Sequence, residues 1–237
     1  TNNMKKIIIL GAGPAGLATA LELSKKGAKV DLYESRNVVG GLGGSEKIDG
    51  MVYDYGPHIY HTHDDQMKKF WRDNFGDLLI EKEFFSKNHK DGVLYDYPLS
   101  YDAIEKFPEA IKQKVKKDLK ELRPENIMRA QNFKEVVTAI VGPTLQDLFF
   151  ETYSKKLWGI PTTAMSAKWA PKRIEIRQKN LPFYYGQFSA VGKYGTGSIY
   201  ERIKEKIISL GGKIFFGETI NKFETDKNKI KFLSTAS

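Results

Sequence analysis

Residues 5–34 read KKIIILGAGPAGLATALELSKKGAKVDLYE and contain the main signals for the fold. The β-branched run that ends at Leu10 is typical of a buried parallel strand. Apolar residues recur at helical spacing after Gly16, and a second strand-like run, residues 29–33, ends at Glu34. The order strand, glycine turn, helix, strand and acidic residue predicts the first β-α-β unit of a dinucleotide-binding domain.

Each part of this motif has a separate physical reason. Gly11 allows the tight turn, Gly13 allows the backbone to approach a pyrophosphate, and Gly16 allows close packing of the helix. The helix N-terminus then faces the phosphates. Glu34 lies 18 residues after Gly16 and can accept hydrogen bonds from ribose hydroxyls. A glycine turn without a ligand is the alternative, and the strand, helix and acid in register argue against it.

A second glycine cluster follows in residues 36–45, which read RNVVGGLGGS. Glycines permit positive φ angles and close backbone approach, so Gly40 and Gly41 indicate a second loop that contacts a phosphate or a ring. A flexible loop is the alternative interpretation.

The remaining sequence predicts an interrupted α/β fold. Residues 83–97 predict a hairpin, and helical patterns cover residues 108–122, 132–140 and 144–157. Strand and helix signals of the first kind return after Leu181. We therefore expect a Rossmann-like FAD/NAD(P)-binding domain, a parallel sheet with helices, that is interrupted by a largely helical substrate domain. The expected boundaries are residues 4–57 and 191–237 for the first domain and 58–190 for the insertion.

The composition is that of a globular chain of 237 residues, with 38 Lys and Arg against 29 Asp and Glu. Because cysteine is absent, disulfides, thiolate zinc sites and thiol catalysis are excluded. The lysines are dispersed and no nucleic-acid motif accompanies them, so we expect no nucleic-acid partner. No apolar run reaches the roughly 18 residues of a spanning helix, and we expect a cytoplasmic protein without a membrane span.

Three motifs together resemble a family of flavin enzymes. They are the glycine turn at residues 11–16, Glu34 followed by Arg36 and Gly40-Gly41, and the GTGS segment at residues 195–198 before a helical pattern. The family includes UDP-galactopyranose mutase and the protoporphyrinogen-oxidase-like and amine-oxidase-like proteins. The resemblance implies FAD, bound without a covalent link, and reduced if the chain is a mutase. It implies these cofactor-binding residues: Gly11, Gly13, Pro14, Ala15, Gly16, Glu34, Ser35, Arg36, Gly40, Gly41, Leu42, Tyr55, Gly56, Pro57 and His58.

Further segments are similar to the mutases in particular. Residues 55–62, YGPHIYHT, look like the histidine loop beside the flavin, and residues 153–159, YSKKLWG, look like the segment near the uridine. Arg173 and Arg177 match the spacing of an arginine pair that faces the flavin and the substrate diphosphate. The resemblance thus implies His58, His61, Arg173 and Arg177 as catalytic residues. It implies Tyr153, Trp158, Arg173, Arg177, Tyr184 and Tyr185 as substrate-binding residues, and no metal site.

Other segments differ from the mutase pattern. Residues 158–161 and 165–174 look more like the protoporphyrinogen-oxidase-like bacterial proteins, and Asp96-Tyr97-Pro98 stands where mutases usually carry Asn-Leu-Pro. Family members also continue well past Asp226, so the sequence indicates a truncated chain or a fragment.

Three functions remain open at this point. The first is a mutase of a nucleotide sugar in surface-polysaccharide synthesis, in which reduced flavin attacks the anomeric carbon and the sugar ring opens and recloses. The second is an FAD oxidoreductase of the protoporphyrinogen-oxidase or amine-oxidase type. The third is a truncated, inactive FAD-binding domain. A small-molecule substrate is expected in both enzyme hypotheses, and a homodimer is compatible with them.

Overall fold

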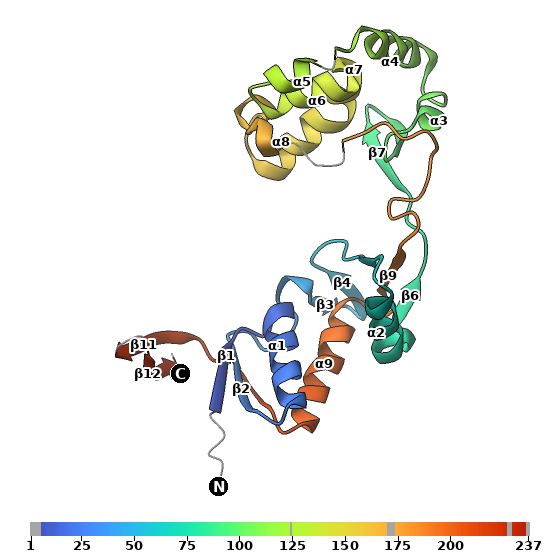
Figure 1. Ribbon diagram of the computed structural model, residues 1–237. Helices are drawn as coiled ribbons and strands as arrows, with labels where there is room; N and C mark the ends of the chain where they lie inside the picture. The colour runs from blue at the N-terminus through green and yellow to red at the C-terminus, as the bar shows by residue number, and fades with distance from the viewer. Residues whose placement is uncertain (1–5, 124, 170–173, 227–228, 236–237) are drawn as a thin grey trace. The chain divides into compact units, whose positions relative to one another are not determined.

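The structure is a computed structural model that describes residues 6–123, 125–169, 174–226 and 229–235. The chain divides into two compact units (Figure 1). Unit 1 comprises residues 1–82 and 186–237, and unit 2 comprises residues 83–185.

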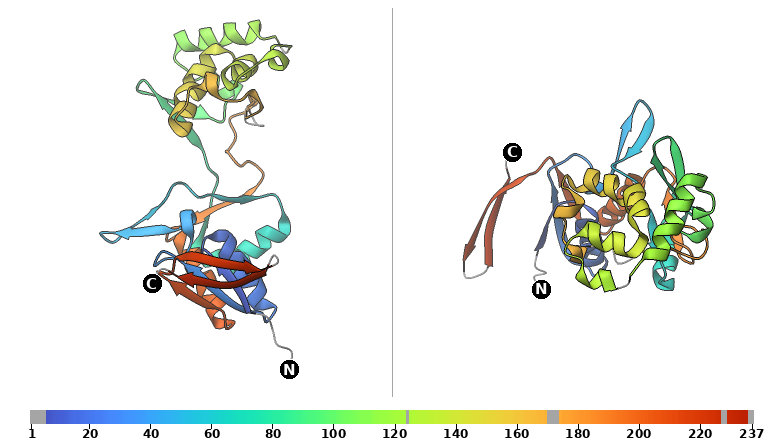
Figure 2. Two further views of the ribbon diagram at one scale, coloured as in Figure 1. Left: turned by 90° about the vertical axis from the view of Figure 1, so that its left-hand side faces the viewer. Right: turned by 90° about the horizontal axis from the view of Figure 1, so that it is seen from above.

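The core of unit 1 is a parallel sheet in the order β1-β2-β10. The strands are β1 (Lys6–Leu10), β2 (Lys29–Glu34) and β10 (Lys213–Phe216). Helices α1 (Pro14–Lys25) and α9 (Gly197–Ser209) lie side by side (Figures 1 and 2) and bury apolar residues with the sheet. The structure therefore confirms the Rossmann-like parallel sheet with helices that residues 5–34 predict.

The other elements of unit 1 are short. They are the 3₁₀ turn η1 (Gly41–Gly43), the hairpin β3 (Ser45–Ile48) and β4 (Met51–Asp54), strands β5 (Tyr60–Thr62), β6 (Leu79–Glu81) and β9 (Phe188–Gly192), helix α2 (Asp65–Phe75), the 3₁₀ turn η2 (Gly76–Leu78), and the hairpin β11 (Ile220–Asp226) and β12 (Lys229–Thr235). Asp64 caps α2, because its Oδ1 accepts a hydrogen bond from the Met67 amide at 2.8 Å.

The boundary between the units differs from the expected one. Strands β5 and β6 both pair antiparallel with β9, so residues 58–82 and 186–190 pack with unit 1. The sequence assigns both segments to the insertion. The pairing joins residues more than a hundred positions apart, such as Tyr60 and Ala190, and such contacts leave no local signal.

Unit 2 contains one hairpin and a group of helices. The hairpin is β7 (Ser86–Lys90) and β8 (Val93–Tyr97). The helical elements are α3 (Tyr101–Ile104), α4 (Glu109–Glu121), α5 (Glu125–Arg129), α6 (Phe133–Val141), α7 (Pro143–Leu145), the π-helical turn η3 (Gln146–Glu151), α8 (Thr152–Trp158) and the 3₁₀ turns η4 (Thr162–Ala164) and η5 (Ala167–Trp169). Buried residues of β8, α4, α6 and η3, including Tyr95, Val115, Phe133 and Phe149, form its core. Among the described residues, every helix is too short or too polar to cross a membrane.

Among the glycines of the described residues, Gly16 leaves the least room for a Cβ atom. A Cβ atom added there would overlap the backbone carbonyl oxygen of Gly11, which no side-chain movement can relieve. We predict that Gly16→Ala lowers the free energy of unfolding by about 2 kcal/mol or more, because α1 must shift away from β1. Chemical denaturation followed by circular dichroism measures the change.

Gly13→Ala is the matched control. A Cβ atom at Gly13 meets nothing within 4 Å, and its φ of −71° suits alanine. We expect a loss of stability below about 1 kcal/mol for this variant. Equal stability of Gly16→Ala and the unchanged chain would contradict the packing argument.

Candidate functional site

The glycine turn of unit 1 forms a cradle of backbone groups. Gly11 has a φ of +90°, and its amide donates to the Tyr33 carbonyl at 2.8 Å, so the turn is fixed to β2. Helix α1 then begins at Pro14 with Gly13 as its N-cap. The amides of the first helical turn have no intrahelical acceptor, and the positive end of the helix dipole lies there. This arrangement suits a phosphate, and the space in front of Gly13 is free for it.

The second glycine loop lies against the first. The Gly40 amide donates to the Ala12 carbonyl at 2.8 Å, and a Cβ atom at Gly41 would come 3.2 Å from the Gly13 Cα atom. Tyr200 of α9 packs against the loop, since a Cβ atom added at Gly43 would lie 2.8 Å from the Tyr200 hydroxyl. Leu42 is 80% exposed at the tip of the loop. The two predicted glycine segments therefore form one continuous backbone surface.

Glu34 is buried at the end of β2 and takes part in the same surface. Its carboxylate accepts hydrogen bonds from the Ala12 amide at 2.7 Å, the Arg36 amide at 2.9 Å and the Ser35 hydroxyl at 3.3 Å. A carboxylate offers about four acceptor positions. One position thus remains for a ribose hydroxyl, and the three bonds hold the carboxylate in place beside the cradle.

Arg36 and Tyr55 form a linked pair next to the second loop. The Arg36 guanidinium lies 5.1 Å from the centre of the Tyr55 ring, donates to the Tyr55 hydroxyl and reaches the Gly41 carbonyl at 3.5 Å. The Tyr55 hydroxyl donates to Glu46, and this hydrogen bond raises the pKa of the phenol. The pair therefore connects β4 with the loop that carries Gly40 and Gly41.

The histidine loop begins beside a hydrogen-bonded carboxylate that the sequence analysis does not single out. Asp54 accepts bonds from the Ser45 hydroxyl, from the Thr196 hydroxyl at 2.7 Å and from the Thr196 amide at 3.0 Å. Burial acts to raise the pKa of Asp54, but these hydrogen bonds outweigh it and hold the pKa below its usual range. The only sequence signal is the position of Thr196 inside the GTGS segment.

The two predicted histidines have different surroundings. The Nδ1 atom of His58 is enclosed and has no hydrogen-bond partner among the described residues. The Nδ1 atom of His61, on β5, lies 3.0 Å from the side-chain oxygen of Gln187, which directly precedes β9. Within the described parts of the chain, no group of three or more His, Asp or Glu side chains could hold a metal ion.

A shallow hollow lies next to the histidine loop in unit 1. Its volume is about 550 Å³, and its lining residues are Val52, Asp54, Gly56, Pro57, Gly192, Lys193, Tyr194 and Gly195. The hollow brings together the predicted Gly56 and Pro57 with the GTGS segment. The glycine cradle, the fixed Glu34 carboxylate and the enclosed, unpaired His58 nitrogen fit a bound dinucleotide.

Unit 2 contains a pocket of about 370 Å³ whose walls are largely aromatic. The predicted residues Tyr153 and Trp158, both on α8, contribute to it. Its remaining lining residues are Ser86, Lys87, Asn88, Tyr97, Phe133, Phe149, Phe150, Ser154, Leu157 and Phe183. Exposed aromatic faces of this kind can stack on a planar base.

Arg177 contacts the segment that carries the lining residue Phe183, because its guanidinium reaches the carbonyl of the preceding Pro182. Its backbone pairs with Leu99 and Tyr101, and its guanidinium donates to the Pro182 carbonyl at 3.3 Å and contacts Glu175 at 3.5 Å. Burial raises the pKa of the Tyr97 phenol. The positive charge of Arg177 acts to lower the same pKa, but the effect of burial is larger. The guanidinium is therefore close enough to influence a residue of the pocket wall.

The other predicted substrate residues are placed differently. Tyr184 packs edge-on against Phe183 at 4.8 Å, and Tyr185 is 60% exposed. Neither is among the described residues that line the pocket. Arg173 lies outside the described residues.

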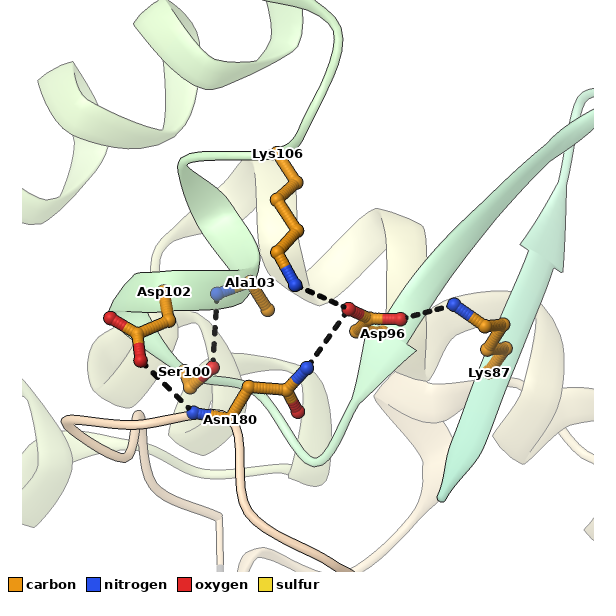
Figure 3. Close-up of polar contacts among 7 residues, drawn as sticks. All are labelled: Lys87, Asp96, Ser100, Asp102, Ala103, Lys106 and Asn180. Atoms are coloured by element: carbon orange, nitrogen blue, oxygen red, sulfur yellow. Dashed lines mark hydrogen bonds and ion pairs between the residues drawn. The ribbon is translucent and has the colours of Figure 1, made fainter.

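A polar cluster fixes the segment that carries Arg177 and Phe183 (Figure 3). Asp96 of β8 pairs with Lys87 of β7, with Lys106 at 3.5 Å and with the Asn180 side-chain amide at 2.9 Å. The Asn180 backbone amide also donates to Asp102 at 3.4 Å. The cluster therefore ties the segment around Asn180 to the hairpin, and Lys87 of the cluster also lines the pocket.

Comparisons with known proteins find similarity to a domain family and to two mutases. Residues 9–73 match the family model described as an NAD(P)-binding Rossmann-like domain. The chain is 26% identical over 212 residues to a probable UDP-galactopyranose mutase of Klebsiella pneumoniae, and 25% identical over 206 residues to dTDP-fucopyranose mutase of Escherichia coli. These alignments cover 86% and 84% of the chain and 54% of each relative. The chain thus spans about half the length of these relatives.

Solved structures give a similar result. A crystal structure of reduced UDP-galactopyranose mutase superposes with a TM-score of 0.68 at 26% identity, over 89% of this chain and 48% of the other. A candidate protoporphyrinogen oxidase from Exiguobacterium sp. 255-15 also superposes with a TM-score of 0.68, over 98% of this chain and 56% of the other, but at 17% identity. The second likeness shows the fold alone. The mutase likeness extends through both units.

The ion pairs of Asp96 should make the stability of unit 2 depend on pH. Its hydrogen bond with Lys87 holds the pKa of Asp96 below its usual range. A carboxyl group with a lowered folded pKa stabilises the fold above its unfolded pKa of about 3.9, and this contribution disappears as the pH falls through the folded pKa. We predict that Asp96→Asn lowers the stability of unit 2 by roughly 1 kcal/mol at pH 7, and that the difference shrinks below about pH 4. Urea denaturation between pH 3 and pH 7 measures both effects.

Asp147→Asn is the control for this experiment. Asp147 pairs with Lys90 of the same hairpin at 2.6 Å, but its side chain is 62% exposed, so its loss should have a smaller effect. A stability difference for Asp96→Asn that is independent of pH would contradict the assigned ion pairs.

Proposed function

We propose that the chain carries the FAD-binding and nucleotide-sugar-binding parts of a flavin-dependent mutase that interconverts pyranose and furanose rings. The substrate class is a pyrimidine nucleoside diphosphate sugar. The observation that carries the proposal is the aromatic pocket formed by Tyr153 and Trp158 beside the charge of Arg177. It supports this reading because both mutase relatives are named after sugars on pyrimidine nucleoside diphosphates.

In unit 1, the two glycine loops and Glu34 would hold the adenosine diphosphate part of FAD. The amides at the start of α1 are donors for the pyrophosphate, and the Glu34 carboxylate is an acceptor for a ribose hydroxyl. His58, Gly56 and Pro57 would line the flavin side of the site. When bound and reduced, the flavin supplies the nucleophile for the ring interconversion.

In unit 2, the pocket would position the nucleotide. Trp158 and Tyr153 present ring faces on which a uracil or thymine base can stack, and Arg177 supplies a planar cation for the phosphates. The role of these residues is orientation, because a base held in an aromatic pocket fixes the position of the attached sugar. Arg177 keeps its contacts to Glu175 and Pro182 and can still donate from its remaining N–H groups.

An oxidoreductase is the second candidate. It would use the same FAD cradle and is supported by the fold of the candidate protoporphyrinogen oxidase. It has no need of a nucleotide pocket, and the mutase reading therefore explains more of unit 2. A role in surface-polysaccharide synthesis follows from the mutase reading as part of the same proposal. A cofactor-binding chain without turnover is the non-enzymatic alternative.

The first test is a flavin titration. We predict that the purified chain binds added FAD and that Gly13→Ala, which keeps the fold, weakens binding by about tenfold or more, because its methyl group occupies the space for the pyrophosphate. Protein fluorescence quenching and the flavin absorbance spectrum measure binding. Equal FAD affinity of Gly13→Ala and the unchanged chain would rule out the assigned cradle.

The second test concerns the nucleotide. We predict that UDP and dTDP bind the chain and that Trp158→Ala weakens both by roughly five- to a hundredfold, since one base stack contributes about 1–3 kcal/mol. Isothermal titration calorimetry measures the affinities. Trp71→Phe is the control, because Trp71 packs against Tyr60 and Phe75 in unit 1 and should leave nucleotide binding unchanged. If UDP binds with the same affinity to Trp158→Ala, the pocket is not the nucleotide site.

A further inference from the structure

We propose that the hydroxyl of Tyr97 donates a hydrogen bond to a phosphate oxygen of the nucleotide, and so selects nucleoside diphosphates over nucleosides in the unit 2 pocket. The inference rests on the proposed function and deepens it. It assigns a specificity role to a residue that the sequence analysis does not include among the substrate-binding residues.

The position of the Tyr97 ring is well defined. Tyr97 is the last residue of β8 and lines the pocket. Its ring stacks on Phe149 with centroids 6.0 Å apart and packs against Phe183 at 5.9 Å. Both phenylalanines line the same pocket. Rings packed on two sides have little freedom to turn, so the hydroxyl keeps one place in the pocket wall.

The hydroxyl of Tyr97 is available to a ligand. Within the described residues it has no hydrogen-bond partner, and its oxygen is not among the enclosed side-chain atoms that lack one. A half-buried phenol without a protein partner satisfies its donor through water or a ligand. Because burial raises the pKa of this phenol, the group keeps its proton near neutral pH and acts as a donor.

The charges around Tyr97 set the direction in which a nucleotide would bind. The phenol lies within electrostatic reach of Arg177 and of Tyr153. Tyr153 and Trp158 are the two α8 residues of the pocket lining on which the base is proposed to stack. Arg177 marks the cationic side, where the phosphates belong. Because Tyr97 lines the same pocket as Tyr153 and Trp158, and its phenol lies within electrostatic reach of Arg177, we place its hydroxyl at the phosphate end of the ligand.

The test uses a variant that removes only the oxygen atom. We predict that Tyr97→Phe raises the dissociation constant for UDP about tenfold, as expected for one hydrogen bond to a charged group, and leaves that for uridine unchanged. Calorimetric titrations of the full chain with UDP and uridine give both constants. Thermal unfolding should be the same as for the unchanged chain, since the ring contacts are kept.

Tyr95→Phe is the matched control. Tyr95 lies two residues earlier on the same face of β8 and packs against Phe107 and Phe149, but it is buried in the core and outside the pocket lining. We expect unchanged affinities for UDP and uridine in this variant. The comparison separates the hydroxyl's contact with the ligand from a general effect of removing a phenol from β8.

Each other outcome overturns the inference in a distinct way. An unchanged UDP affinity in Tyr97→Phe means that the hydroxyl does not contact the phosphates, and the proposed function stands. Equal weakening of UDP and uridine means that Tyr97 acts on the base or on the pocket shape. If the unchanged chain binds neither UDP nor uridine, the proposed function fails and the inference fails with it.

Discussion

The close approach of α1 to β1 is the constraint on which unit 1 depends. The backbone of Gly16 lies directly against the Gly11 carbonyl, so the helix starts immediately above the glycine turn. This placement directs the first-turn amides toward the space in front of Gly13. It also fixes the Ala12 backbone, whose amide binds Glu34 and whose carbonyl binds Gly40. The cradle, the ribose acceptor and the second loop therefore all depend on one helix-to-strand contact.

Unit 2 is organised around a different contact. Asp96 holds three elements together: the neighbouring strand through Lys87, the segment after α3 through Lys106, and residues 177–183 through Asn180. The last segment brings Phe183 to the pocket, where α8 supplies Tyr153 and Trp158. A partly buried carboxylate with several partners is a suitable anchor, because each additional partner offsets more of the cost of removing it from water. The pocket is thus assembled from segments far apart in the sequence.

The sequence predicts local features well and long-range ones poorly. The β-α-β unit of residues 5–34 and the hairpin within residues 83–97 follow from periodicity and turn chemistry, and the structure confirms both. The β5-β9-β6 sheet and the Asp96 cluster join distant residues with no shared local pattern. For the same reason, residue spacing alone gives no indication that Asp54 or Tyr97 belongs to a candidate site. Arg177 follows from the resemblance, but its place beside Tyr97 is known only from the fold.

The central claim is that one chain joins a dinucleotide cradle to a separate pocket for a pyrimidine nucleotide. A crystal structure of the chain soaked with UDP tests it most directly. The account predicts that the uracil ring stacks in the pocket of unit 2 against Trp158 or Tyr153, with the phosphates on the side of Arg177. UDP bound only at the glycine cradle of unit 1, or absent at millimolar concentration, would contradict it.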